Sequence, residues 1–111
     1  MEVLGATADV VESANGTVIV NPGQSLEAVW NGKDNGRSSI FRLPLRVIGT
    51  GVLSVTVNGE TRTFTAADGE TAWQFKSALA ANDVSIAYDG DDGYAEILNG
   101  RRLAGFGFTF R

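Results

Sequence analysis

The clearest pattern in the chain is a period-two alternation of residue types over positions 52–65. The first half alternates Leu or Val with small polar residues, and the second half is rich in threonine. Successive side chains of a strand point to opposite faces, so each half predicts a half-buried β-strand. Asn58 and Gly59 lie between the halves, and this pair is typical of a two-residue turn that needs positive φ angles. The pattern therefore predicts an antiparallel hairpin with one buried face.

Similar alternating or β-branched runs recur along the chain, separated by turns rich in Gly, Asn and Asp. The further expected strands are residues 17–21, 26–30, 38–48, 71–81, 84–88, 94–98 and 101–111, with residues 3–11 as an extended arm or first edge strand. Residues 71–81 are also rich in alanine, which suits a helix, but the aromatic residues there favour a strand. Turns are expected at Asn82–Asp83 and at Asn99–Gly100. About eight short strands with little helix predict one all-β domain, a sandwich or barrel, with residues 1–12 as a possible N-terminal arm.

The longest expected strand, residues 38–48, contains a proline near its middle. Pro44 cannot donate a ladder hydrogen bond, so we expect this strand to lie at a sheet edge or to bulge there. Phe41 falls on its apolar face, whereas Arg42 and Arg46 fall on the opposite face. The two arginines either protect an exposed edge by charge or form ion pairs with an acidic partner surface, and the sequence favours neither.

Composition excludes several kinds of chemistry. The 111 residues include no Cys and no His, so there is no disulfide, thiolate zinc site or histidine general base. The formal net charge is −4 with a pI near 4.6, which is unlike a nucleic-acid-binding protein. No apolar run approaches the roughly 20 residues of a membrane helix, and the acid at Glu2 argues against a secretion signal. We expect a non-enzymatic protein with no metal, no cofactor, no nucleic acid and no membrane partner.

Two groups of residues are candidate binding sites. Asp89, Asp91 and Asp92 could form a calcium loop, but the EF-hand spacing is missing, so a solvated hairpin loop is favoured. Among the aromatic residues, Trp73 and Tyr88 lie on alternating apolar faces, which predicts core packing.

Two other aromatic residues are the candidates for a surface role. Trp30 lies next to a loop and is the best candidate for a surface aromatic, either stacking on a sugar or anchoring an interface. Tyr94 is the second candidate for a contact with a glycan.

From residue 39 onward the order of segments resembles that of known sandwich domains. GTGVLSVTVNGETRTFT is followed by the strand with Trp73, then by VSIAYDG and YAEILNGRRL. This order resembles the jelly-roll sandwiches of the galactose-binding and carbohydrate-binding-module type. The length of the chain, its lack of Cys and His and its extended start also resemble the small jelly-roll decoration proteins of tailed bacteriophage capsids. These are the cement or staple proteins, including those of epsilon15-like phages.

The resemblance implies an antiparallel β-sandwich of jelly-roll type and a structural role. The protein would bind the outer capsid surface and stabilise the mature shell by bridging neighbouring subunits of the major capsid protein. It would be made in the host cytoplasm and reside in the virion. Independently of the resemblance, the general prevalence of two-fold symmetric oligomers leads us to expect self-association as a dimer. The expected contact residues come from residues 1–11 and 38–46, together with one tryptophan: Val3, Leu4, Val10, Val11, Phe41, Arg42, Arg46 and Trp30. The alternative is a carbohydrate-binding module that recognises a surface glycan through Trp30 and Tyr94.

Overall fold

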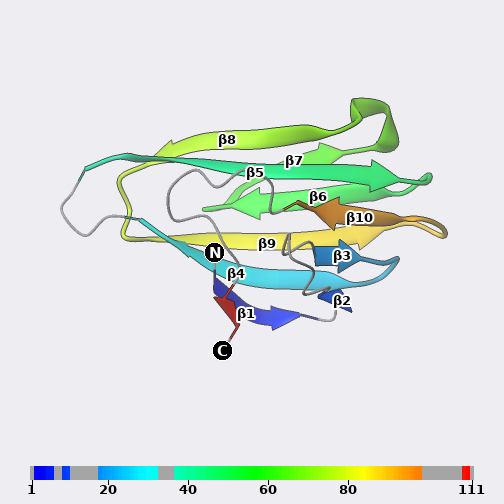
Figure 1. Cartoon of the computed structure of the whole chain (residues 1–111), viewed down its shortest axis with the longest axis horizontal. Helices are drawn as coiled ribbons and strands as arrows, with labels where there is room; N and C mark the ends of the chain where they lie inside the picture. The colour runs from blue at the N-terminus through cyan, green and yellow to red at the C-terminus, as the bar shows by residue number, and fades with distance from the viewer. Residues whose placement is uncertain (1, 7–8, 11–17, 33–36, 99–108, 111) are drawn as a thin grey trace.

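The computed structural model describes residues 2–6, 9–10, 18–32, 37–98 and 109–110, and these residues are almost entirely β (Figure 1). Sheet I contains six strands in the order β11 (Thr109–Phe110), β1 (Glu2–Ala6), β4 (Ser25–Asn31), β9 (Ala81–Asp89), β6 (Val52–Val57) and β7 (Glu60–Phe64). Sheet II contains five strands in the order β2 (Asp9–Val10), β3 (Val18–Val20), β10 (Tyr94–Ile97), β5 (Ser39–Ile48) and β8 (Thr71–Ser77). A short 3₁₀ turn, η1 (Ala66–Asp68), connects β7 to β8.

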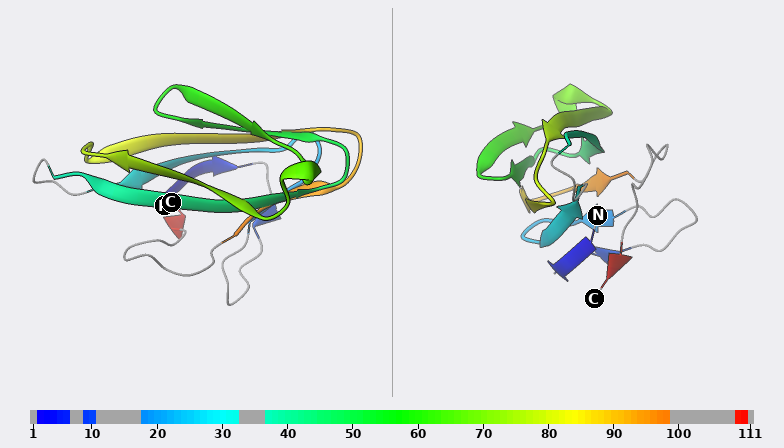
Figure 2. Two further views of the ribbon diagram at one scale, coloured as in Figure 1. Left: turned by 90° about the horizontal axis from the view of Figure 1, so that it is seen from above. Right: turned by 90° about the vertical axis from the view of Figure 1, so that its left-hand side faces the viewer.

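The chain passes from one sheet to the other at almost every connection. Among the described strands, only β2 to β3 and β6 to β7 follow each other within one sheet. Neighbouring strands are antiparallel except β1 and β11, which are parallel. The two layers pack face to face (Figure 2). The expected antiparallel sandwich of jelly-roll type is confirmed, although the described residues form eleven strands instead of about eight, in part because the expected first strand, residues 3–11, is represented by two short strands, β1 and β2.

The central hairpin has the predicted geometry. Asn58 and Gly59 take φ angles of 49° and 87°, and Val57 lies opposite Glu60 across the turn. Leu53, Val55 and Val57 of β6 are buried, while the threonines of β7 are exposed. Residues 71–77 form a strand, as the aromatic residues there indicated. Position-by-position alternation was therefore a sound guide to these elements.

The prediction that residues 38–48 lie at a sheet edge or bulge at Pro44 is wrong, because β5 lies between β10 and β8 and its register with β8 continues unbroken through Pro44. The carbonyl of Pro44 accepts a hydrogen bond from the backbone N–H of Leu98 (2.9 Å). Since the N and O atoms of a strand residue point to the same side, the proline nitrogen also faces Leu98. Leu98 lies just beyond β10, so Pro44 removes one hydrogen bond at the end of that ladder and leaves the pairing with β8 intact.

The predicted turn at Asn82–Asp83 is also wrong. Both residues lie inside β9, and the chain turns at residues 78–80 instead. Asn82 is fully buried, and its Nδ2 donates to the carbonyl of Trp30 (3.0 Å). Its Oδ1 accepts a hydrogen bond from Nδ2 of Asn58 (2.8 Å), in the hairpin turn. A buried asparagine with these partners is a strand residue that ties two neighbouring turns together, which local sequence could not reveal.

Part of the last predicted segment cannot be compared with the structure. The Asn99–Gly100 turn and residues 101–108 lie outside the described residues. Thr109 and Phe110 form β11, which pairs with Glu2 and Val3 of β1.

Replacing Asn82 with alanine should destabilise the fold. The change leaves the buried carbonyl of Trp30 and the amide of Asn58 without this partner, and we expect the free energy of unfolding to fall by about 1–3 kcal/mol. Urea denaturation of both proteins measures the difference. Ser85→Ala, an exposed change on the same strand, is the control and should stay within about 0.5 kcal/mol of the wild type. Equal effects of the two changes would show that the buried network is unimportant.

Candidate functional site

The outer face of sheet II carries a group of exposed side chains at the free end of β5 and β8. Ile40 lies opposite Lys76, and Arg42 lies opposite Gln74, with all four side chains on the solvent side of the sheet. Ile40 is 60% exposed, the largest value among the exposed large hydrophobic residues of the described chain. We call these four residues the β5–β8 patch. It combines an exposed apolar side chain with two cations and an amide, a composition that suits a protein interface.

Arg46 lies farther along the same face, but its charge is already paired. Its Nε and Nη2 donate to the two carboxylate oxygens of Glu96, at 2.9 and 3.2 Å. Glu96 is only 9% exposed although it is on the outer face. The hydrogen bond to Glu96 and the negative charge of that residue raise the pKa of Arg46. Arg46 therefore has a structural partner within the chain.

Arg42 and Lys76 differ from Arg46 in this respect. Within the part of the chain that the structure describes, neither residue forms an ion pair. Of the two arginines singled out from the sequence, Arg42 is the one whose charge remains available to a partner. Lys76 was missed because residues 71–81 were examined for their apolar face only, although the same alternation places Lys76 beside Ile40 on the outer face.

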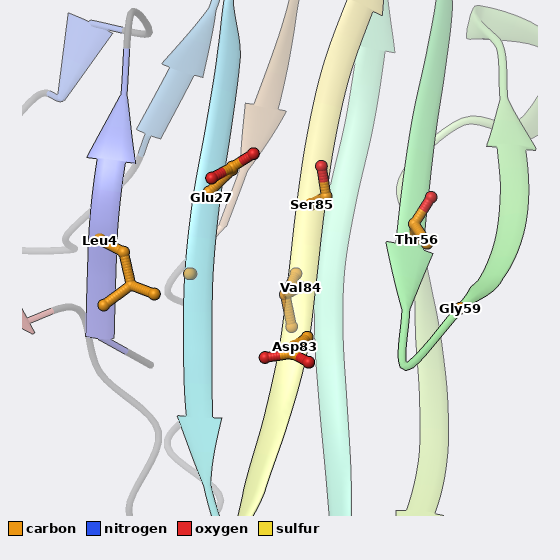
Figure 3. A pocket seen from close by; sticks show the side chains of 8 residues that line it. Leu4, Glu27, Thr56, Gly59, Asp83, Val84 and Ser85 are labelled. Atoms are coloured by element: carbon orange, nitrogen blue, oxygen red, sulfur yellow. The ribbon is translucent and has the colours of Figure 1, made fainter.

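The outer face of sheet I contains a shallow depression of about 230 Å³ (Figure 3). Its lining comes from β1, β4, β6, β9 and the hairpin turn: Leu4, Glu27, Ala28, Thr56, Gly59, Asp83, Val84 and Ser85. Small outward side chains of β9 and β6, Ser85 and Thr56, form part of this lining. Glu27, Asp83 and Ser85 provide oxygen atoms, whereas Leu4 provides an apolar border that is 51% exposed. None of the lining residues is aromatic.

Two expected contact residues are in the core. Trp30 is 4% exposed and packs edge-to-face on Phe41, with ring centroids 5.0 Å apart, so its prediction as a surface aromatic is wrong. Phe41 is also buried and stacks on Phe75 at 5.0 Å. Trp30 is buried because it follows the alternation of β4, in which Leu26, Ala28 and Trp30 all point into the sandwich.

The remaining expected contacts lie on different faces. Leu4 is on the outer face of sheet I, while Arg42 and Arg46 are on the outer face of sheet II. Tyr94, the second candidate glycan contact, is half-buried on the outer face of sheet II, opposite Ile48. The side chains of Val3 and Val10, and the whole of Val11, lie outside the described part of the chain.

The acidic loop has a structural arrangement. In the described residues there is no group of three or more acidic side chains that could hold a metal ion. Asp92 instead accepts hydrogen bonds at Oδ1 from the backbone N–H and the hydroxyl of Thr50, at 3.0 and 2.7 Å. These two hydrogen bonds lower the pKa of Asp92. The hydroxyl of Tyr88 donates to the carbonyl of Asp92 (2.8 Å) and accepts from the N–H of Gly51 (3.0 Å), which connects the two loops.

Glycine is required where these loops meet. Gly93 has a φ of 70°, and a Cβ on it would lie 1.8 Å from the carbonyl oxygen of Ile48. A Cβ on Gly51 would lie 2.3 Å from the ring of Tyr88. The close approach of backbone to backbone and to the buried ring leaves no room for a side chain. The loop rich in Asp and Gly is thus a packed corner of the fold.

Comparisons with known proteins do not assign this chain to a family. The sequence matches no protein-family model and no curated protein. Among solved structures, the chain is similar to a family GH115 4-O-methyl-α-glucuronidase with specificity for decorated arabinogalactans, at a TM-score of 0.49 and 12% sequence identity. The match covers 85% of this chain but 16% of that enzyme, so the chain spans a small part of its length. A likeness this distant carries no argument about function. No helix in the described residues is long and apolar enough to cross a membrane.

The hydrogen bonds to Asp92 should make the stability of the fold depend on pH in the acidic range. Because the folded-state pKa lies below the ordinary value of 3.8, the ionised carboxylate contributes stability that is fully present above that pH and is lost as the pH falls through the folded-state pKa. Asp92→Asn should therefore lower the Tm at neutral pH, and the gap from wild type should narrow in acid. Thermal unfolding followed by circular dichroism from about pH 7 to about pH 2 measures this gap.

Asp91→Asn is the matched control, because Asp91 is an exposed neighbour in the same loop. It should change the Tm little at any pH. A constant gap between Asp92→Asn and wild type over the whole range would contradict the assignment.

Proposed function

We propose that this chain is a non-enzymatic structural protein that binds the outer surface of a viral capsid and stabilises the mature shell. It would do so by bridging neighbouring subunits of the major capsid protein. The proposal starts from the resemblance of the sequence to small jelly-roll decoration proteins. The structural observation that supports it is the presence of two candidate contact surfaces, of different chemistry, on opposite sides of one rigid sandwich.

A bridging protein needs two separate surfaces, since it must contact two subunits at once. The β5–β8 patch provides two cations that form no ion pair with other described residues, and an exposed Ile40, on the outer face of sheet II. The depression on sheet I provides the carboxylates of Glu27 and Asp83 and the apolar side chain of Leu4 on the other face. The first surface suits an acidic, partly apolar partner, and the second suits a partner that presents amine or hydroxyl groups.

The stabilising effect would follow from mass action. A protein that binds only the assembled lattice shifts the equilibrium towards that lattice, by about 2.7 kcal/mol per site at a free concentration of 100 Kd. The sandwich suits this role because its sheets are hydrogen-bonded over long strands and its core contains bulky side chains from both layers. Little contact energy is then spent on ordering the binding surface.

The second candidate function is recognition of a surface glycan. Burial of Trp30 removes the expected stacking residue, so the observation that favours this function is the depression on sheet I. Hydroxyl groups of a sugar could bind the oxygens of Glu27, Asp83 and Ser85. Tyr94 lies on the opposite sheet, so the two expected glycan contacts cannot form one platform.

Co-sedimentation tests the capsid proposal. The probe is the mature capsid of the phage whose genome encodes the chain, stripped of its native copy. We expect saturable binding at a fixed ratio to the capsid subunit, and capsids that survive a higher temperature once loaded. Arg42→Gln should weaken binding about tenfold, since it removes an unpaired cation from the patch.

Ala67→Glu is the control variant, because it lowers the net charge by the same amount at an exposed position in η1. It should bind like the wild type. Failure of the wild type to bind intact mature shells, or a gene that lies outside any phage genome or prophage, would rule the proposal out. A glycan array, with Asp83→Ala as the negative variant, then tests the second candidate. Tryptophan fluorescence is a poor readout for glycans here, because Trp30 and Trp73 are both buried.

A further inference from the structure

Strand β8 is a free edge of sheet II. It pairs only with β5, and no described strand lies on its other side. The carbonyl of Pro44 points towards Leu98, away from β8. Since successive residues of a strand direct their N–H and C=O groups to opposite sides, Leu43 and Phe41 direct theirs towards β8. Their partners on β8 are Phe75 and Trp73. The backbone N–H and C=O groups of the other β8 residues, Ala72, Gln74 and Lys76, therefore point away from the sheet.

The outward backbone groups of β8 are a template for another strand. No backbone hydrogen bond to Ala72, Gln74 or Lys76 from outside β5 occurs in the described residues. The strand is seven residues long, and among the three residues with outward backbone groups only Lys76 is charged. Long free edges with few charges accept partner strands readily.

The neighbouring edge of sheet I is protected, in contrast. Strand β7 has five residues, and its Arg62 points inward, with the guanidinium 4.5 Å from the ring centroid of Trp73. Glu60 and Arg62 also form an ion pair at 3.4 Å along this edge. Inward-pointing and paired charges are devices that discourage edge pairing. Within the described residues, one of these two adjacent edges is thus protected and the other is open.

We infer that β8 pairs with β8 of a second copy of this chain, antiparallel about a two-fold axis at Gln74. In this register Gln74 lies opposite Gln74 of the second copy, and Ala72 lies opposite Lys76. The outward backbone groups on each side then meet their partners, and the two lysines stay apart. The small side chain of Ala72 leaves space for the longer Lys76 that faces it.

Charge also favours this partner. Glu70, one residue before β8, is exposed, and continuing the β5–β8 register by one residue places it opposite Arg46, on the outer face of sheet II. Across the two-fold axis, Glu70 of one copy is the diagonal neighbour of Lys76 of the other. Each dimer would gain two such opposite-charge pairs. An unrelated acidic strand could pair with Lys76 but would gain nothing from Glu70.

The inferred dimer would also extend the proposed function. Only this extension rests on the proposed function, and the dimer itself does not. Two copies of sheet II would form one continuous sheet, with both β5–β8 patches on the same face around the axis. A capsid partner with its own two-fold symmetry could then be contacted by both copies at once, which raises the overall affinity.

Sedimentation velocity of the purified full chain, without capsids, tests the inference. We expect a dimer whose fraction grows with concentration. Gln74→Pro should give a monomer with nearly unchanged Tm, because the N–H that it removes points away from β5. Gln74→Ala, which keeps that N–H, should remain a dimer. A wild type that is monomeric at every concentration, or a Gln74→Pro variant that still dimerises, would overturn the inference.

Exchanging the charges of Glu70 and Lys76 tests the register of the dimer. It also tests the dimer itself if Gln74→Pro fails to fold. Lys76→Glu should weaken the dimer roughly tenfold by placing it beside Glu70 of the other copy. Adding Glu70→Lys to the same chain should restore the wild-type dimer. A double variant no tighter than Lys76→Glu would overturn the proposed register. Because no capsid is present, these results do not depend on whether the capsid proposal holds.

Discussion

The fold depends on burying one face of every long strand, because a chain without cysteine has no disulfide to hold the layers together. The two sheets meet through side chains that alternate inward, and each fully buried Leu or Ile contributes about 1.5–3 kcal/mol relative to exposure. At one end of the sandwich, Trp30 of sheet I packs edge-to-face on Phe41 and Phe75 of sheet II, at 5.0 and 5.9 Å. These aromatic pairs fix the relative position of the layers, and so determine which residues can appear on the outer faces.

Polar side chains close the sandwich where the apolar core ends. At one end the amides of Asn58 and Asn82 satisfy each other and the carbonyl of Trp30. At the opposite end the hydroxyl of Tyr88 connects two loops. Buried polar groups are tolerable only when they are bonded, so these networks restrict the turns to one arrangement. The loops could not be rearranged without exposing an unsatisfied group, and this makes them structural elements.

Local patterns predicted the strands well and their neighbours poorly. The hairpin at Asn58–Gly59 was predictable because the turn and both strands are adjacent in sequence. The central position of β5 was not, because it depends on pairing with β10, some fifty residues later. Pro44 indicated an edge, yet β10 simply ends beside it. Likewise, Asn82 resembled a turn residue, because its partner Asn58 is invisible to local sequence.

Of the candidate site, the sequence identified Arg42 correctly as an outward residue and misplaced Trp30 and Phe41. The alternation along the strand placed Phe41 correctly on the apolar face, but a side chain that is buried on this face cannot form a contact surface. For Trp30 the nearby loop was given more weight than the alternation of Leu26 and Ala28. Lys76 and the depression around Asp83 could not be found from one strand, since each arises from side chains on neighbouring strands.

Net charge is a poor guide to the surfaces of such a sandwich. The chain carries a formal charge of −4, yet Arg42 and Lys76 stand unpaired within the described part of one outer face, while Glu27 and Asp83 border a depression on the other. Alternation sends every second residue of a strand to the same face, so the register between strands decides the local sign of charge. A thin sandwich can therefore present opposite chemistries on its two sides. A sandwich with opposite chemistries on its two sides can contact two unlike surfaces at once, as the bridging role that we propose requires.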